Sequence, residues 1–228
     1  MWLRGIMVVI KAVLFDLGGT LIKTAPVPII FERILLSHGI QAQGNIDESF
    51  LDEVAKEMVH DYGLPYRKFW RIYNGKILRK MGLSEDLEKL ADIISDEWWD
   101  NADLELYPEV KDTLLMLRRQ GLKLGIVTNG FRKDVDDIFS RVGLTDQFDA
   151  AVGVDDVGKP KPEKKIFLYA LEKLSINPPE ALFVGDNLEL DYKGAERSGL
   201  KPLLIDRNNK ACDDVRKIYN LKEVTQFL

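Results

Sequence analysis

The stretch of this sequence best suited to chemistry follows an apolar run that is typical of a buried strand. The run covers residues 8–15, is interrupted only by Lys11, and leads into Asp16, a Gly-Gly pair and Thr20. In parallel α/β sheets, ligands bind at the carboxyl ends of the strands. A carboxylate there, beside glycines that let the backbone approach a ligand closely, can act as a nucleophile or a metal ligand. The same pattern also fits an aspartate that caps an ordinary turn, so Asp16 alone does not decide between the two.

Two further predicted strands end in polar residues. One of them ends in Thr128, Asn129 and Gly130, and another is followed by an acidic loop at residues 186–191. Taken singly, the first segment is typical of a turn and the second of a solvated loop. Their occurrence in order, at the ends of successive strands, favours a shared site.

Between those two strand ends lies a basic loop that contains Lys159 and Lys161, which singly would be typical surface charges. Carboxylates from two strand ends can together hold a hard divalent cation such as Mg²⁺, which prefers oxygen ligands. A threonine hydroxyl, turn amides and a lysine can hold the oxygens of a phosphoryl group. The sequence therefore predicts a site for a metal-assisted reaction of an anion.

The elements that must position these residues form two patterns. From residue 107 onward, strands alternate with helices up to a predicted C-terminal helix, which indicates an α/β fold: a parallel sheet with helices on both faces. Residues 23–106 instead show four stretches of helical periodicity and no strand pattern, and Ser84 is the predicted N-cap of the fourth helix. We therefore expect a core made of residues 1–22 and 107–228, and an inserted four-helix domain at 23–106, joined by a two-stranded hinge.

Composition limits the classes of partner. The chain has 228 residues, 46% of them hydrophobic, and a formal net charge of −5, so neither nucleic acid nor an anionic membrane is expected as a partner. The single cysteine, Cys212, cannot form an intrachain disulfide, and the N-terminal apolar run lacks a cleavage site. We expect a cytoplasmic protein, monomeric or homodimeric, that acts on a small molecule.

Four segments resemble, in order, the motifs of the haloacid dehalogenase superfamily. They are Asp16-Leu17-Gly18-Gly19-Thr20, Thr128-Asn129-Gly130, Lys161-Pro162, and Gly185-Asp186 through Asp191. The resemblance covers nearly the whole core and places a helical, C1-type cap after the first motif. It implies a Rossmann-like catalytic core and a cap that opens for substrate and closes to exclude water.

The resemblance also implies roles for individual residues. Asp16 would be the nucleophile that forms an aspartyl intermediate, and Mg²⁺ would be held by Asp16, the carbonyl of Gly18 and Asp186. Thr128 and the amides near Asn129 and Gly130 would bind the phosphoryl oxygens. Lys161 fits the spacing of the catalytic lysine that binds phosphate, with Lys159 left open. A further set of residues would orient the metal ligands or the lysine without contacting the substrate, namely Asp191, Thr20 and Asn187.

Gly18 departs from the pattern of the superfamily's phosphatases, which usually carry a second aspartate at this position. That aspartate protonates the leaving alkoxide and then activates water. General acid–base catalysis contributes roughly 10²–10⁴-fold to a rate. We therefore expect a phosphohydrolase that is slow, or that prefers good leaving groups, or that takes its acid from the cap.

Two alternatives remain open, and a third is less favoured. A 2-haloacid dehalogenase also lacks the second aspartate, but it typically has a tyrosine at the position of Gly18 and no acid at the position of Asp186. A protein that kept the fold and lost the reaction would still bind phosphate or metal. A dinucleotide-binding module is disfavoured, because the first motif is not the glycine fingerprint and its carboxylate would repel a pyrophosphate.

Overall fold

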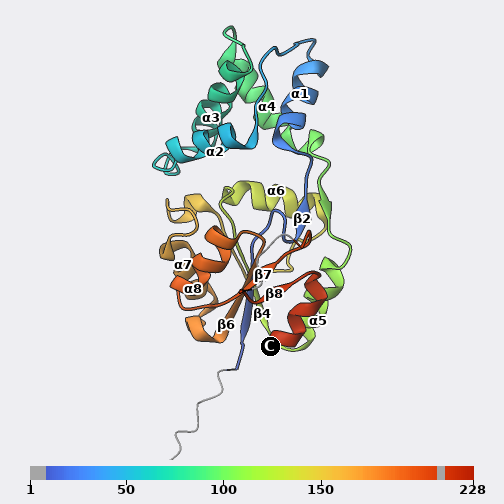
Figure 1. The fold of residues 1–228 in the computed structure, drawn as a ribbon, viewed down its shortest axis with the longest axis vertical. Coiled ribbons are helices and arrows are strands. Elements are labelled where there is room, and N and C mark those ends of the chain that lie inside the picture. The colour runs from blue at the N-terminus through green and yellow to red at the C-terminus, as the bar shows by residue number, and fades with distance from the viewer. Residues whose placement is uncertain (1–8, 210–213) are drawn as a thin grey trace, which may run out of the picture. The chain divides into compact units, whose positions relative to one another are not determined.

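The structure is a computed structural model that describes residues 9–209 and 214–228 (Figure 1). The start of the predicted first strand and Cys212 lie outside the described residues. The chain forms two compact units: Met1–Ile22 with Leu106–Leu228, and Lys23–Glu105. The first unit contains the sheet, and the second contains the helices of the insert.

The first unit is built on a six-stranded sheet with the order β5-β4-β1-β6-β7-β8. Strand β1 (Ala12–Phe15) pairs in parallel with β4 (Lys123–Val127) on one side and β6 (Ala181–Gly185) on the other. All four residues of β1 are buried, as expected for a strand covered on both faces. The outer strands, also parallel to their neighbours, are β5 (Ala150–Val152), β7 (Lys201–Ile205) and β8 (Lys217–Ile218). The predicted parallel α/β sheet is confirmed.

Helices cover both faces of this sheet, with α7 (Lys164–Leu174) and α8 (Lys193–Arg197) on one face and α5 (Val110–Arg119) on the other (Figure 1). On the α7 face, the rings of Phe167 and Phe183 meet edge to face, with their centroids 5.0 Å apart. The remaining elements are α6 (Arg132–Val142), the 3₁₀ helices η1 (Val154–Asp156), η2 (Pro178–Glu180) and η4 (Leu221–Phe227), and the π-helix η3 (Leu188–Tyr192). The sheet is thus held rigid by apolar packing on two sides, which fixes the strand ends.

The second unit contains four helices, α1 (Val27–Ser37), α2 (Glu48–Glu57), α3 (Tyr66–Lys80) and α4 (Leu87–Asn101). Buried apolar residues of α1, α3 and α4 form a cluster that includes Phe31, Ile77 and Ala91, and the partly buried Phe50 and Leu51 of α2 pack against it. The chain passes between the units at two short strands, β2 (Ile22–Lys23) and β3 (Glu105–Leu106), which pair with each other. A four-helix insert was the expectation from the sequence.

Three boundaries differ from the sequence prediction. Helix α4 begins at Leu87 and not after Ser84, because Asp86 adopts a left-handed conformation (φ 51°) that no helix interior accommodates. Strand β1 begins at Ala12, although its apolar run begins earlier. The chain ends in a 3₁₀ helix preceded by the two-residue strand β8, which is too short to produce a periodic signal.

Within the described parts of the chain, no helix combines the length and the apolar character needed to cross a bilayer.

Candidate active site

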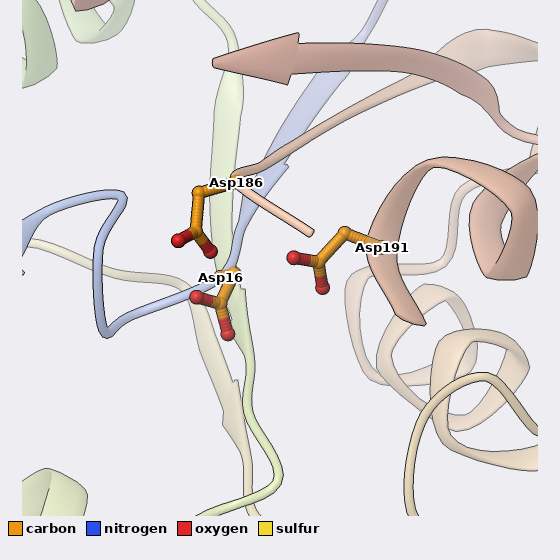
Figure 2. A group of neighbouring side chains, drawn as sticks. All are labelled: Asp16, Asp186 and Asp191. Carbon is orange, nitrogen blue, oxygen red and sulfur yellow. The ribbon is translucent and has the colours of Figure 1, made fainter. Parts of the chain in front are cut away.

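Two aspartates lie side by side because their strands are neighbours. Asp16 follows β1 and Asp186 follows β6, and the amide of Asp16 donates a hydrogen bond of 2.9 Å to the carbonyl of Val184. Asp191 comes from η3, directly after that loop. Figure 2 shows the three carboxyl groups turned toward one another, and one oxygen of each lies within 4.8 Å of the others. The carboxyl edge of the sheet therefore carries a compact acidic cluster.

Lys161 lies inside this cluster. Its Nζ donates to Asp16 Oδ1 at 2.5 Å and to Asp191 Oδ1 at 2.6 Å, and the residue is only 4% exposed. Burial works against the charged ammonium, but the two carboxylates outweigh it and raise the pKa of Lys161 above its ordinary value. Lys159, the other candidate lysine, is exposed. The structure thus brings Lys161, and not Lys159, to the aspartates.

The aspartates carry more negative charge than Lys161 balances. Burial raises the pKa of Asp16 to about 7; the charge of Lys161 lowers it, while those of Asp191 and Asp186 raise it. Asp186 is exposed at the surface, but the protein atoms around its carboxyl group still remove part of its hydration, and this desolvation and then the charge of Asp191 raise its pKa. Once all three carboxylates are ionised, one ammonium leaves an excess of negative charge, and carboxylate oxygens are the ligands that Mg²⁺ prefers. The donor set therefore fits a hard divalent cation.

Asn129 holds the backbone of Lys161 at both of its polar groups. The amide of Lys161 donates to Asn129 Oδ1 at 2.6 Å, and Asn129 Nδ2 donates to the carbonyl of Lys161 at 3.3 Å. The side chain of Asn129 therefore orients the lysine, and any contact of this residue with phosphate falls to its backbone amide. The sequence indicated only the phosphate role.

Thr128 and Gly130 form a small turn at the end of β4. The amide of Gly130 donates to Thr128 Oγ1 at 3.1 Å, and Thr128 is 8% exposed. This bond occupies the oxygen of the hydroxyl and leaves its proton to donate elsewhere. Gly130 therefore fixes the direction of Thr128, which is the side chain suited to donate to a phosphoryl oxygen.

Asn187 and Thr20, the two other residues expected to support the carboxylates, differ in their hydrogen bonds. The amide of Asn187 donates to Asp191 Oδ2 at 3.0 Å, and its side chain accepts from the amides of Glu189 and Leu190, so it shapes the turn that carries Asp191. Thr20 is fully buried, and among the described residues its hydroxyl has no hydrogen-bond partner. The structure gives Asn187 a clear supporting contact and Thr20 none through its side chain.

The two glycines of the first loop have different constraints. Gly19 has φ +71°, and a Cβ there would lie 2.2 Å from Asp186 Oδ2. A Cβ at Gly18 would meet no described atom within 4 Å. Only a glycine fits at position 19 while Asp186 keeps its place, whereas position 18 has room for a side chain.

Sequence reasoning missed Arg207, which contacts the loop that carries Asp16. Its guanidinium donates to the carbonyls of Gly19 and Thr20 and to the carboxylate of Glu109. The available signal was its place two residues beyond β7, at the same edge of the sheet as the other strand ends. A lone basic residue in a loop gives no stronger sequence signal than that.

Residues 10–199 match the family model described as haloacid dehalogenase-like hydrolase. Among curated proteins, the chain is similar to a glyceraldehyde 3-phosphate phosphatase of Methanopyrus kandleri, with 32% identity over 87% of this chain and 84% of that protein. Among solved structures, it is similar to a 2-haloacid dehalogenase from Pseudomonas syringae, with 28% identity, a TM-score of 0.71, and coverage of 95% of this chain and 97% of that one. It is also similar to a HAD phosphatase from Thermococcus onnurineus, with 28% identity, a TM-score of 0.65, and coverage of 96% and 97%.

The paired glycines give a direct test of the loop geometry. We expect Gly19→Ala to lower the free energy of unfolding by about 1–3 kcal/mol, because it strains a left-handed residue and pushes against the Asp186 carboxylate. Gly18→Ala is the matched control and should change it by less than about 1 kcal/mol. Urea unfolding of both variants measures the difference, and equal effects would contradict this account of the loop.

Proposed function

Because the chain belongs to the haloacid dehalogenase-like hydrolases, we propose that it is a Mg²⁺-dependent phosphohydrolase acting on a small phosphorylated compound. The observation that carries the proposal is the buried contact of Lys161 with Asp16, set among carboxylates that exceed it in charge. A buried carboxylate paired with an ammonium is suited to attack an anion only if further positive charge is supplied. The similarity to named phosphatases supports the same reading.

We assign the metal to Asp16, the backbone carbonyl of Gly18 and the carboxylate of Asp186. When bound, Mg²⁺ would neutralise the charge of the phosphoryl oxygens and of the carboxylates around them. Asp191 serves the site through Lys161, because its oxygens contact that ammonium and the amide of Asn187. These are the roles that the resemblance to the superfamily implies, and they remain proposals.

In the proposed reaction, a carboxylate oxygen of Asp16 attacks phosphorus in line with the leaving group. A bond forms between Asp16 and phosphorus, the bond from phosphorus to the ester oxygen breaks, and the alcohol leaves with a proton from solvent or from the substrate. Water then attacks phosphorus, the bond between phosphorus and the Asp16 oxygen breaks, the water's proton passes to the phosphate or to solvent, and inorganic phosphate leaves with the Asp16 carboxylate restored. Lys161 neutralises charge on the nucleophile and the phosphoryl group, and the Thr128 hydroxyl donates to a phosphoryl oxygen.

We assign substrate choice to the insert Lys23–Glu105, since the core residues named for this site are all assigned to the phosphoryl group, the metal or their support. The relative from Methanopyrus kandleri is named for glyceraldehyde 3-phosphate, so this three-carbon ester is the first substrate to test. Water exclusion by the cap would protect the aspartyl phosphate from premature solvation.

A dehalogenase is the second candidate, favoured by Gly18 and by the similarity to a 2-haloacid dehalogenase. Halide leaves without protonation, so the missing acid would cost such an enzyme nothing. The acidic cluster at Asp186 counts against it, because a metal-free reaction has no use for an added carboxylate beside the nucleophile. Release of chloride from a 2-haloacid in the presence of EDTA would favour this candidate over the phosphohydrolase.

The proposed function is tested by phosphate release from glyceraldehyde 3-phosphate and from an aryl phosphate, with Mg²⁺ and with EDTA. We expect activity that requires Mg²⁺ and falls by at least about 10³-fold in Asp16→Asn, because an amide is not a nucleophile here. Asp155→Asn, a change in an exposed carboxylate that caps α6, is the control and should retain activity. Phosphate binding without turnover by the unaltered protein would instead identify a binding protein that has lost the reaction.

Gly18 allows the missing acid to be restored. We expect Gly18→Asp to raise kcat for an alkyl phosphate by about 10–100-fold while changing kcat for an aryl phosphate by less than about threefold, because aryl oxides leave without a proton. Gly18→Asn has nearly the same size and no proton to give, so it is the matched control. Equal responses of the two esters would show that protonation of the leaving group does not limit the enzyme.

The raised pKa values predict how Mg²⁺ binding depends on pH. Metal binding requires ionised carboxylates, and Asp16 keeps its proton up to a pH of about 7, so affinity should rise by about tenfold per pH unit up to that point and level off above it. Calorimetric titration with Mg²⁺ from pH 5.5 to 8.5 measures this dependence. Asp191→Asn should move the midpoint to lower pH, because the charge of Asp191 raises the pKa of both other aspartates. A flat profile would contradict the assignment of Asp16 as a ligand.

A further inference from the structure

The side chain of Arg207 forms hydrogen bonds with the backbone of the loop that follows Asp16. Its Nη2 donates to the carbonyl of Thr20 at 2.7 Å and its Nε to the carbonyl of Gly19 at 3.2 Å. Its Nη1 donates to Glu109 Oε1 at 2.7 Å. All three guanidinium nitrogens are therefore engaged, two of them on backbone carbonyls of a single turn. A guanidinium presents its donors in a fixed plane, so this contact sets orientation as well as distance.

Arg207 is itself held from the other side. Glu109 is 7% exposed and also accepts a hydrogen bond of 3.4 Å from the amide of Leu221. Burial opposes ionisation of Glu109, but the hydrogen bond from Arg207 outweighs it and keeps the pKa of Glu109 below its ordinary value. The guanidinium also lies over the ring of Tyr107, 3.4 Å from its centroid, in a cation–π contact. The arginine is thus fixed by an ion pair and by an aromatic face.

The turn that Arg207 contacts includes Asp16 and Gly18 and lies against Asp186, the three residues assigned to the metal. The α-carbon of Gly19 lies against the carboxylate of Asp186, with no room for a further atom. The carbonyl of Gly18 belongs to the peptide unit that ends at Gly19, so a rotation of this turn would move that carbonyl and displace Asp186 together. Asp16, four residues before Thr20, begins the same turn.

We propose that Arg207 is a positioning residue for the metal site, acting through the carbonyls of Gly19 and Thr20. The inference rests on the proposed function, because it concerns the metal assigned to Asp16, Gly18 and Asp186. None of the described hydrogen bonds of Arg207 goes to Asp16, Gly18 or Asp186. It keeps the turn in one orientation, so that the Gly18 carbonyl and the Asp186 carboxylate face the same point.

The test compares Arg207→Lys with Arg118→Lys. Arg118 lies in the same unit and has a similar bonding pattern, since its Nη1 donates to Asp149 Oδ1 at 3.1 Å and its Nη2 to the carbonyl of Gln147 at 3.0 Å, away from the site. We expect calorimetric Kd values for Mg²⁺ to rise by about 10–100-fold in Arg207→Lys and by less than twofold in Arg118→Lys. Saturating Mg²⁺ should restore kcat of Arg207→Lys to within about threefold of the unaltered enzyme.

A purely structural role for Arg207 predicts a different result. Both variants would then lose thermal stability with unchanged Kd for Mg²⁺, and that outcome overturns the inference while the proposed function stands. Failure of the unaltered protein to bind Mg²⁺ would overturn both. If Arg207→Lys does not fold, Glu109→Gln decides, because it weakens the anchor of Arg207 and leaves the arginine in place. We expect that variant to bind Mg²⁺ about 3–10-fold more weakly, and an unchanged Kd overturns the inference.

Discussion

The contact on which the rest of the site depends is the ammonium of Lys161 placed between Asp16 and Asp191. Each of these groups is almost fully buried, so each would be costly to keep charged alone. Removing one partner from such a buried arrangement costs about 3–5 kcal/mol, because it leaves an uncompensated charge. The site can therefore exist only where the surrounding fold holds all three groups in register. That requirement explains why they come from the carboxyl edge of a rigid sheet.

The neighbouring backbone is shaped around these charges. Asn129 bonds both polar groups of the Lys161 backbone, and Asn187 supplies an amide to Asp191, so two of the three ion-paired residues have their own support. Asp186 is positioned by exclusion, since the bare α-carbon of Gly19 is what leaves room for its carboxylate. Charge attraction thus acts between Lys161 and the carboxylates, hydrogen bonds hold Lys161 and Asp191, and steric fit positions Asp186. Because these residues form one cluster, a substitution at one of them would alter the position or the charge of the others.

Much of this arrangement follows from the sequence, because it depends on local signals. The buried strand before Asp16, and the order of the strand ends, predict the parallel sheet and the convergence of Asp16 and Asp186, whereas the choice of Lys161 over Lys159 came from the resemblance to the superfamily. The missed features depend on contacts that are distant along the chain. Arg207 contacts a turn that lies 187 residues earlier in the sequence. The two hydrogen bonds between Asn129 and Lys161 join two different loops. The start of α4 was misplaced for a local reason, since an aspartate in the left-handed region is not visible in a periodicity pattern.

Phosphatases of the superfamily usually combine two roles at the position of Gly18, a backbone carbonyl that binds the metal and an aspartate side chain that donates a proton. The backbone of Gly18 can still offer a carbonyl to a cation, because that group needs no side chain, while the proton donor is absent. In the proposed reaction, charge neutralisation by Lys161 and a metal would lower the barrier for attack on phosphorus, yet it would do nothing for an alkoxide that leaves without a proton. The proposed reaction therefore predicts a rate that follows the basicity of the leaving group. Space remains beside Gly18, so a substrate that carries its own acidic group could occupy it and supply the proton that the chain lacks.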